Sequence, residues 1–447
     1  MVNLYKGSFI LNIHSEQKTM DKLVEKALTV EKKKAPLLVP EVFGPLQGVR
    51  IVSSGILIAQ PFAAYMAALW GAEVIHVERP GGDTYRHSPP FIERNGRKVN
   101  TWWAQESRNM LSIVIDLKKK EGKEIFLKLL RTADIWMESS KPGTYKKLGI
   151  TDDIAFKVNP KLTIVHVSGY GTWGHPEYLG LPSYDAIAAA FSGWMSINGF
   201  PDSPPYKPFP YTGDYITALV TLSAALAGYI YAQRTGKGVS IDVAQFEAIA
   251  NTFGGLWLQT IMLKNVPKRM GNKDIYFQPY DVFETKDGQY VFIGALGYDV
   301  FKRLCDAIGL DFEEWKDVHY APGMHTEKGK LFDRKLREWV KSHTLEEVLE
   351  IMKKHAVPCI KIYSLKDAVE DPHYNAREDF IEWKDESIGD IIKGWGIIPK
   401  FSRVEKPRIW RGSPRLGQDA RLILSKLLGY EDSVIDKLIE NGIVCCE

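Results

Sequence analysis

Asp214 is the residue whose neighbours give it the clearest chemical potential. It belongs to the segment YTGDY at 211–215, directly before an Ala- and Leu-rich stretch at 215–233 that predicts a long helix. Pro210 stops any helix upstream, and Gly213 allows a ligand to approach the backbone closely. A helix N-terminus favours an ionised carboxylate by roughly 0.3–1 kcal/mol, and such a carboxylate in a cleft can be a nucleophile. A plain N-cap is the simpler interpretation from residue type, and one aspartate can do both.

Basic side chains follow three predicted strands. They are Arg79 after 73–77, Lys118 after 112–115, and Lys141 and Lys147 after 134–137. Parallel sheets bind phosphates just beyond the carboxyl ends of their strands, and Lys and Arg suit that role. Any one of these residues alone would be interpreted as solvated surface charge. Their repetition after three strands favours an anion site.

Other common site chemistries lack their motifs. No G-x-G-x-x-G opens the first predicted helix, which disfavours a dinucleotide enzyme. The four cysteines, Cys305, Cys359, Cys445 and Cys446, show no C-x-x-C spacing, and no H-E-x-x-H occurs among the ten histidines. We therefore expect neither a metal site nor a disulfide framework.

Composition describes an ordinary globular chain of more than one domain. The 447 residues are 45% hydrophobic and carry a formal net charge of +3, which does not indicate nucleic-acid binding. No apolar run reaches about 18 residues, and the N-terminus lacks a secretory signal, so we expect a cytoplasmic protein away from membranes.

The elements that must position these residues alternate between strand and helix. The predicted strands are 49–52, 73–77, 112–115, 134–137, 162–167 and 239–243, and the helices between them include 60–70, 120–130 and 215–233. This order predicts an α/β fold with a doubly wound, mostly parallel, Rossmann-like sheet. A hairpin at 280–283 and 290–293, followed by helices at 298–308 and 331–354, predicts a smaller α+β domain.

Longer stretches resemble one known family. They are GPLQGVRIVSSGILIAQPFAAYMAALWGAEVIHVERPGGD, ADIWMESSKPGTYKKLGI, NPKLTIVHVSGYG, PSYDAIAAAFSGWMSINGF, PFPYTGDY, TGKGVSIDVAQFEA, WRGSPRLGQD and LLGYEDSVIDKLIENGIV. On these motifs the chain resembles the class III coenzyme A transferases from about Gly44 to Val444. ADIWMESSK, HVSGYG and AFSGWMSING are most similar to the branch of carnitine–crotonobetaine and bile-acid-inducible CoA-transferases.

The resemblance implies an activity and a covalent step. The family's nucleophilic aspartate falls on Asp214, which implies an aspartyl anhydride and then an aspartyl-CoA thioester. Coenzyme A would be a substrate, and no tightly bound cofactor is expected. The acceptor acid would be carnitine- or crotonobetaine-like, bile-acid-like or a 2-hydroxy acid.

The resemblance also assigns contacts. CoA would meet Arg79, Lys118, Lys141, Lys147 and Tyr184, although Lys147 stands where relatives usually have Arg. The substrate pocket would include Leu57, Ile58 and Asp185. The apolar Leu57-Ile58 pair and the absence of a glycine-rich lid argue against oxalate or formate as substrates.

Two other functions remain open at this point. An α-methylacyl-CoA racemase shares the family's fold but uses a His base at the position of Tyr184, so this chain would lack its base. A non-catalytic CoA-binding scaffold is disfavoured by the intact TGDY motif.

The implied architecture has four parts. Residues 1–42 form an N-terminal extension with an amphipathic helix in 18–34, through Leu23, Ala27, Leu28 and Val30. Residues 43–260 plus 372–447 form the large domain, 280–366 the small domain, and 261–279 and 367–371 the linkers. The resemblance implies an interlocked homodimer.

Overall fold

The computed structural model describes residues 17–31, 35–40, 44–403 and 407–445. Two compact units divide the chain. The first comprises Met1–Ser192, Pro208–Phe253 and Glu378–Glu447, and the second comprises Gly193–Lys207 and Gly254–Arg377. Residues 193–207 thus fall in the second unit, although the predicted large domain runs unbroken from 43 to 260.

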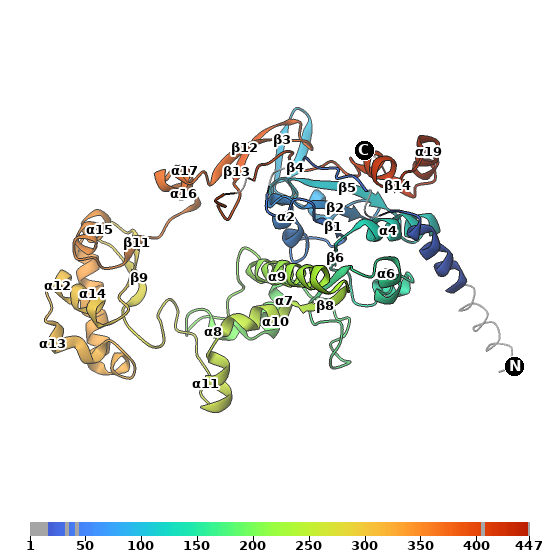
Figure 1. The fold of residues 1–447 in the computed structure, drawn as a ribbon. Coiled ribbons are helices and arrows are strands. Elements are labelled where there is room, and N and C mark those ends of the chain that lie inside the picture. Colours follow the sequence, from blue (N-terminus) through green and yellow to red (C-terminus); the bar gives the residue numbers. More distant parts are fainter. Residues whose placement is uncertain (1–16, 32–34, 41–43, 404–406, 446–447) are drawn as a thin grey trace. The chain divides into compact units, whose positions relative to one another are not determined.

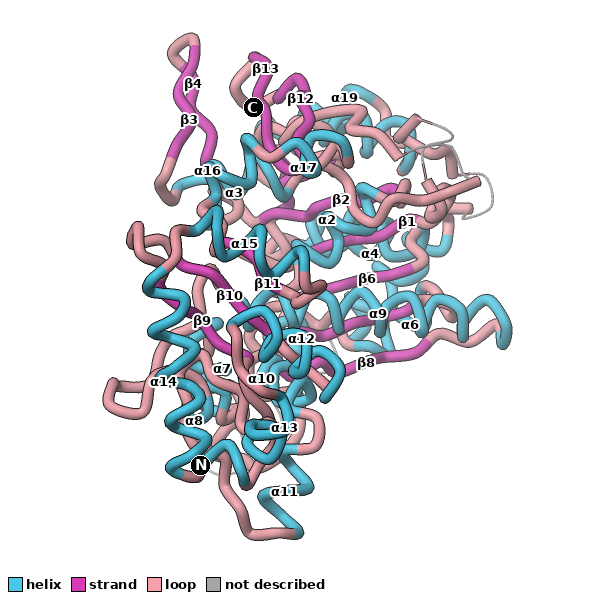
Figure 2. The backbone as a smooth tube through the Cα atoms, turned by 90° about the vertical axis from the view of Figure 1, so that its left-hand side faces the viewer, coloured by secondary structure: helices cyan, strands magenta, loops and turns pink. Residues whose placement is uncertain are grey.

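A seven-stranded sheet forms the centre of the first unit (Figures 1 and 2). Its strand order is β14 (Val444–Cys445), β5 (Met110–Ile115), β2 (Glu73–Glu78), β1 (Arg50–Ser53), β6 (Ile135–Glu138), β7 (Thr163–Ser168) and β8 (Val239–Ala244). Only β14 pairs antiparallel, with β5. The six parallel strands have the doubly wound order, which reverses between β1 and β6. The predicted large parallel sheet is therefore confirmed.

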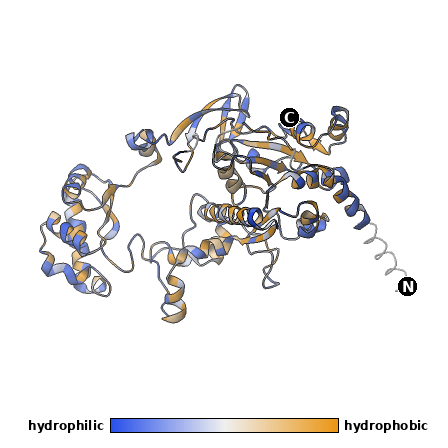
Figure 3. Ribbon diagram, viewed as in Figure 1, coloured by the Kyte–Doolittle hydropathy of each residue, from blue (hydrophilic) through white to orange (hydrophobic). Residues whose placement is uncertain are grey.

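Helices cover both faces of this sheet. They are α2 (Pro61–Leu69), α4 (Lys120–Thr132), α6 (Asp152–Val158), α7 (Asp185–Phe191), α9 (Thr212–Thr235) and α10 (Gln245–Ala250). One apolar cluster packs α4 and α6 against one face, and another packs α2 and α9 against the other. The strands β1, β2, β5 and β6 are buried along their whole length, because helices cover both faces, and Figure 3 shows apolar residues mixed with polar ones in the sheet.

The long helix α9 packs through a stripe of small residues. Gly213, Thr217, Ala218, Thr221 and Ala225 are among its buried positions. Farther along, a Cβ on Gly228 would lie 2.5 Å from the Thr163 side chain, so glycine lets the helix approach β7. Among the described residues, α9 is the helix that is long and apolar enough to cross a membrane by length and composition alone.

The other elements of the first unit surround this core. They are η2 (Thr84–His87), β3 (Phe91–Arg94), β4 (Arg97–Asn100), α3 (Thr101–Glu106), α5 (Thr144–Lys147), η3 (Asn251–Phe253), β12 (Phe380–Asp385), β13 (Asp390–Trp395), α18 (Ala420–Leu422), the π-helix η6 (Ile423–Leu427) and α19 (Asp432–Glu440).

The second unit has a core of its own around a three-stranded antiparallel sheet. The strands are β9 (Tyr280–Glu284), β10 (Tyr290–Gly294) and β11 (Cys359–Lys361), with β10 in the middle. Its helices are α8 (Trp194–Ile197), α11 (Leu256–Met262), α12 (Tyr298–Ile308), α13 (Phe312–Trp315), η4 (Lys316–Val318), η5 (Gly323–His325), α14 (Glu327–Ser342), α15 (Leu345–Lys354), α16 (Leu365–Glu370) and α17 (Pro372–Ala376).

The predicted helix at 331–354 is wrong as one element. The structure divides it into α14 and α15, because Thr344 starts a new helix with a capping box. The Thr344 side chain accepts from the Glu347 backbone, while the Glu347 carboxylate accepts from the Thr344 N–H.

The described part of the predicted N-terminal extension packs against the core of the first unit. A helix at 17–28, dark blue in Figure 1, buries Met20, Leu23, Val24 and Ala27 in the cluster that contains α4. The Lys26 ammonium also donates to Glu124 of α4 at 2.8 Å. The predicted amphipathic helix is present, but its inward face differs from the predicted one, since Leu28 is 44% exposed.

Candidate active site

The predicted nucleophile lies in the first turn of α9 and is not its N-cap. Asp214 is the third residue of the helix, and Tyr211 occupies the cap position without a capping side-chain hydrogen bond. Tyr211 has a left-handed backbone with φ of 46°, which is uncommon for an aromatic residue. Such strained positions cluster at functional sites. The prediction that Asp214 caps the helix is therefore wrong, because the first residue of the helix is Thr212, two residues before Asp214.

Two side chains from neighbouring helices hold Asp214. The amide of Gln245, the first residue of α10, donates to Asp214 Oδ1. The Asp214 backbone N–H donates to Asp185 Oδ1 at 3.1 Å, and Asp185 starts α7. Gly213 makes this possible, because a Cβ there would lie 3.0 Å from that oxygen and 2.8 Å from Ile249. The structure thus brings the predicted Asp185 to Asp214 and adds Gln245, which sequence reasoning missed.

The sequence predicts that the helix start keeps Asp214 ionised, but the surroundings of its carboxyl raise its pKa. Burial, followed by the nearby charge of Asp185, raises the pKa of Asp214 to about 7, and the Gln245 hydrogen bond opposes that rise. Loss of hydration and a like charge both disfavour the carboxylate.

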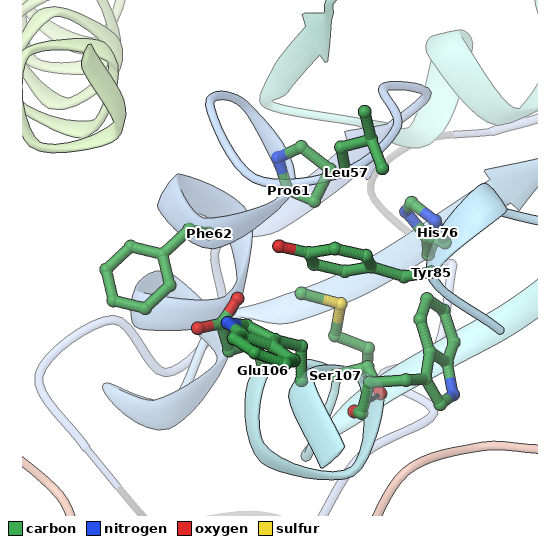
Figure 4. Close-up of a pocket in the computed structure, with 10 residues that line it drawn as sticks. Leu57, Pro61, Phe62, His76, Tyr85, Glu106 and Ser107 are labelled. Carbon is green, nitrogen blue, oxygen red and sulfur yellow. Dashed lines mark hydrogen bonds between the residues drawn. The ribbon is translucent and has the colours of Figure 1, made fainter. Parts of the chain in front are cut away.

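An aromatic cavity adjoins this site (Figure 4). Its lining includes Leu57, Phe62, Tyr85, Trp102 and Glu106. The Tyr215 hydroxyl, from the residue after Asp214, donates to Glu106 Oε1 at 2.6 Å. Burial and the charge of Asp214 raise the pKa of Glu106 to about 7, although Tyr215 and Arg108 oppose that rise. Sequence reasoning missed Glu106; the one signal was a carboxylate within the aromatic run TWWAQE.

The four predicted basic residues come together in one cleft. Arg79, Lys118, Lys141 and Lys147 all line a space of about 1060 Å³ at the carboxyl ends of β1, β2, β5 and β6. All four side chains are exposed, and the salt bridges among the described residues include none of them. The cleft stands where the strand order reverses, the usual ligand position in such sheets. It can hold a phosphorylated ligand.

The remaining predicted residues lie in different places. Leu57 lines the aromatic cavity and has a strained φ of 63°; its N–H donates to the Asp83 carboxylate at 3.2 Å. Ile58 is 2% exposed and packs in the core beside the cavity without lining it. Tyr184 is 67% exposed just before α7 and does not line the cationic cleft.

The described part of the chain offers no set of metal ligands. No group of three or more His, Cys, Asp or Glu side chains there could hold an ion.

A doubly wound sheet with a cationic cleft at its switch point and a half-buried carboxyl in the first turn of a helix is an arrangement that suits an enzyme acting on a phosphorylated substrate. The particular family follows from comparison with known proteins. The model of CoA-transferase family III matches residues 46–420, so the chain belongs to that family and is an enzyme that transfers coenzyme A.

Relatives of known name extend over most of the chain. It is 40% identical to the bile acid CoA-transferase BaiK of Clostridium scindens, over 90% of each protein. It is 36% identical to the L-carnitine CoA-transferase of Proteus mirabilis, over 90% of this chain and 97% of that one. A solved CAIB/BAIF family protein from Brucella suis superposes with a TM-score of 0.74 at 27% identity, covering 86% of this chain and all of the other. These names do not favour the racemase alternative.

Proposed function

We propose that this enzyme moves coenzyme A from an acyl-CoA to a carnitine- or bile-acid-like carboxylic acid, with Asp214 as covalent nucleophile. The observation that carries the proposal is the half-buried Asp214 carboxyl in the first turn of α9, where the Gln245 amide donates to it and Asp185 accepts from its backbone N–H. The names of the relatives support the two acid classes.

The proposed reaction has four steps without net proton transfer. The Asp214 carboxylate attacks the thioester carbonyl, which forms a mixed anhydride and releases CoA thiolate. The thiolate attacks the aspartyl carbonyl, which forms an Asp214–CoA thioester and releases the donor carboxylate. The acceptor carboxylate attacks that thioester and expels the thiolate. The thiolate then attacks the acceptor's acyl carbonyl, which forms the product acyl-CoA and restores Asp214.

The neighbours of Asp214 suit these steps. The Gln245 amide donates to Asp214 Oδ1, so it would also stabilise the negative charge that this oxygen gains when the aspartyl carbonyl is attacked, as an oxyanion donor does. Burial limits water, which would hydrolyse an anhydride or a thioester. Arg79, Lys118, Lys141 and Lys147 would hold the phosphates of CoA.

Substitution of Asp214 tests the nucleophile. Asp214→Asn keeps the shape of the side chain but removes the attacking oxygen, so CoA exchange should fall by at least about a thousandfold. CoA binding, measured by calorimetry, should stay within a few fold. Mass spectrometry of the wild-type enzyme with acyl-CoA alone should find CoA or acyl mass on the peptide that contains Asp214. Normal turnover of Asp214→Asn would refute the assignment.

We also infer a homodimer that acts in the cytoplasm. The apolar helix α11 of the second unit supports the dimer, because Leu258, Ile261 and Met262 are each more than half exposed. Light scattering of the purified protein should give twice the mass of one chain.

A further inference from the structure

Two buried polar atoms of residues that line the aromatic cavity have no hydrogen-bond partner in the described part of the chain. They are Glu106 Oε2 and the Tyr85 hydroxyl oxygen. Tyr85 is 9% exposed. Figure 4 shows that its hydroxyl points toward the side of the cavity where Glu106 and Phe62 lie. A buried polar atom without a partner destabilises a protein because it has lost its hydrogen bonds to water, so such a pair calls for a ligand.

The cavity borders the reacting centre. Asp214 interacts electrostatically with both Glu106 and Tyr85. Tyr215 links Asp214 to Glu106. It is the next residue in the chain after Asp214, and its hydroxyl donates a hydrogen bond to the Glu106 carboxylate. An acyl group bound to the Asp214 carboxyl would therefore have its first carbon atoms close to this cavity.

The size and chemistry of the cavity restrict its occupant. About 10 Å³ is open to the centre of a water-sized group, close to what one water or hydroxyl requires. The walls are the apolar side chains of Leu57, Phe62 and Trp102. An ionised Glu106 oxygen accepts a hydrogen bond, and a phenol both donates and accepts. A hydroxyl group satisfies both partners, whereas a bulky ammonium group exceeds the space.

We propose that Glu106 and Tyr85 form a subsite that receives a hydroxyl group on the acyl part of the substrate acid. The inference rests on the proposed function and adds to it a preference for acids that bear a hydroxyl group. The acid that bears the hydroxyl satisfies both buried atoms, while the acid without it leaves them unpaired. A site built to bind a hydroxyl rejects the analogue without one far more strongly than an apolar pocket distinguishes two hydrocarbons.

Matched pairs of acids test this subsite. CoA exchange is measured at pH 8, where Glu106 is mostly ionised, with L-carnitine against γ-butyrobetaine and with 3-hydroxybutyrate against butyrate, two pairs whose hydroxyl lies on the second carbon from the carboxyl. In each pair only hydroxyl groups differ. We expect wild-type enzyme to prefer the hydroxy acid of at least one pair by about tenfold or more in kcat/KM.

Two variants and a control assign the preference. Tyr85→Phe and Glu106→Gln should each reduce the ratio of kcat/KM values between the hydroxy acid and the deoxy acid at least about threefold, whatever their effect on both acids together. Tyr229→Phe, which removes a hydroxyl on α9 outside the lining of the cavity, should leave the ratio unchanged. The ratio is internal to each variant, so a folding loss does not alter it.

The outcomes separate the two proposals. Exchange without discrimination by wild-type enzyme means that the cavity holds only water and overturns the subsite. A preference unchanged in both variants also overturns it. Absence of exchange with these four acids and with cholate overturns the proposed function, and the subsite with it.

Discussion

At the scale of single residues, the reactivity of Asp214 depends on charges that oppose one another. Burial and Asp185 disfavour its carboxylate, and the Gln245 amide favours it. A carboxylate that is poorly stabilised in its ionised form is a better nucleophile once it ionises, because it loses less on attack. Asp214 thus gains nucleophilicity from the same surroundings that raise its pKa to about 7.

The pH dependence of exchange should reveal this balance. Only ionised Asp214 attacks, so kcat/KM should rise with pH through about 7. Asp185→Asn removes the repelling charge and should move the rise to lower pH. Gln245→Ala removes a donor to the carboxylate, should move it to higher pH, and should lower kcat by roughly ten- to a hundredfold. The measurement is initial rate against pH for the three enzymes, and a shift of the same sign in both variants would contradict this account.

What the sequence could predict at this scale follows from distance along the chain. Asp214 and the basic residues stand in local motifs next to a strand or helix end, so the local pattern together with the family resemblance could single them out as candidates. Gln245 is 31 residues and Glu106 about a hundred residues from the side chains that they contact. Only the packing of α3, α9 and α10 brings them together, and no local pattern records that packing.

At the scale of elements, the helix at 17–28 acts as part of the large core. Leu23 is 1% exposed there, so Leu23→Ala should lower the free energy of unfolding by about 2–5 kcal/mol. Leu28→Ala, on the exposed face of the same helix, should change it by about 0.5 kcal/mol or less. Urea unfolding followed by circular dichroism measures both. Equal effects would show that the helix does not pack on α4.

His166 of β7 connects this strand to β6 and to α6 through the two nitrogens of its ring. Its ring contacts Glu138 at 2.7 Å and Asp152 at 3.1 Å, and these hydrogen bonds and charges outweigh burial and raise the pKa of His166 to about 10. The folded pKa lies above the unfolded one, so the stabilisation is complete below about pH 6.5. It should decline as pH rises toward 10. The difference in unfolding free energy between wild type and His166→Asn should therefore shrink from pH 6 to pH 10; a constant difference would rule out a charged His166.

At the scale of the whole molecule, charge is balanced overall but concentrated locally. The formal net charge is only +3, while four basic side chains that form no salt bridge with the other described residues line one cleft. Attraction for a phosphorylated ligand should therefore belong to this cleft and not to the surface at large. Fold-level prediction succeeded here, because the strand order alone places the four residues at one edge of the sheet.

Ionic strength tests that concentration of charge. Lys118→Ala should weaken CoA binding about five- to tenfold at 0.05 M salt, roughly 1 kcal/mol. The loss should be smaller at 0.5 M, because salt screens exposed charges. Lys157→Ala, an exposed lysine on α6 outside the cleft lining, should bind CoA normally at both salt concentrations. Calorimetric titration with CoA measures each Kd. If Lys157→Ala weakens binding as much as Lys118→Ala does, the net field of the protein attracts CoA and the cleft is not its site.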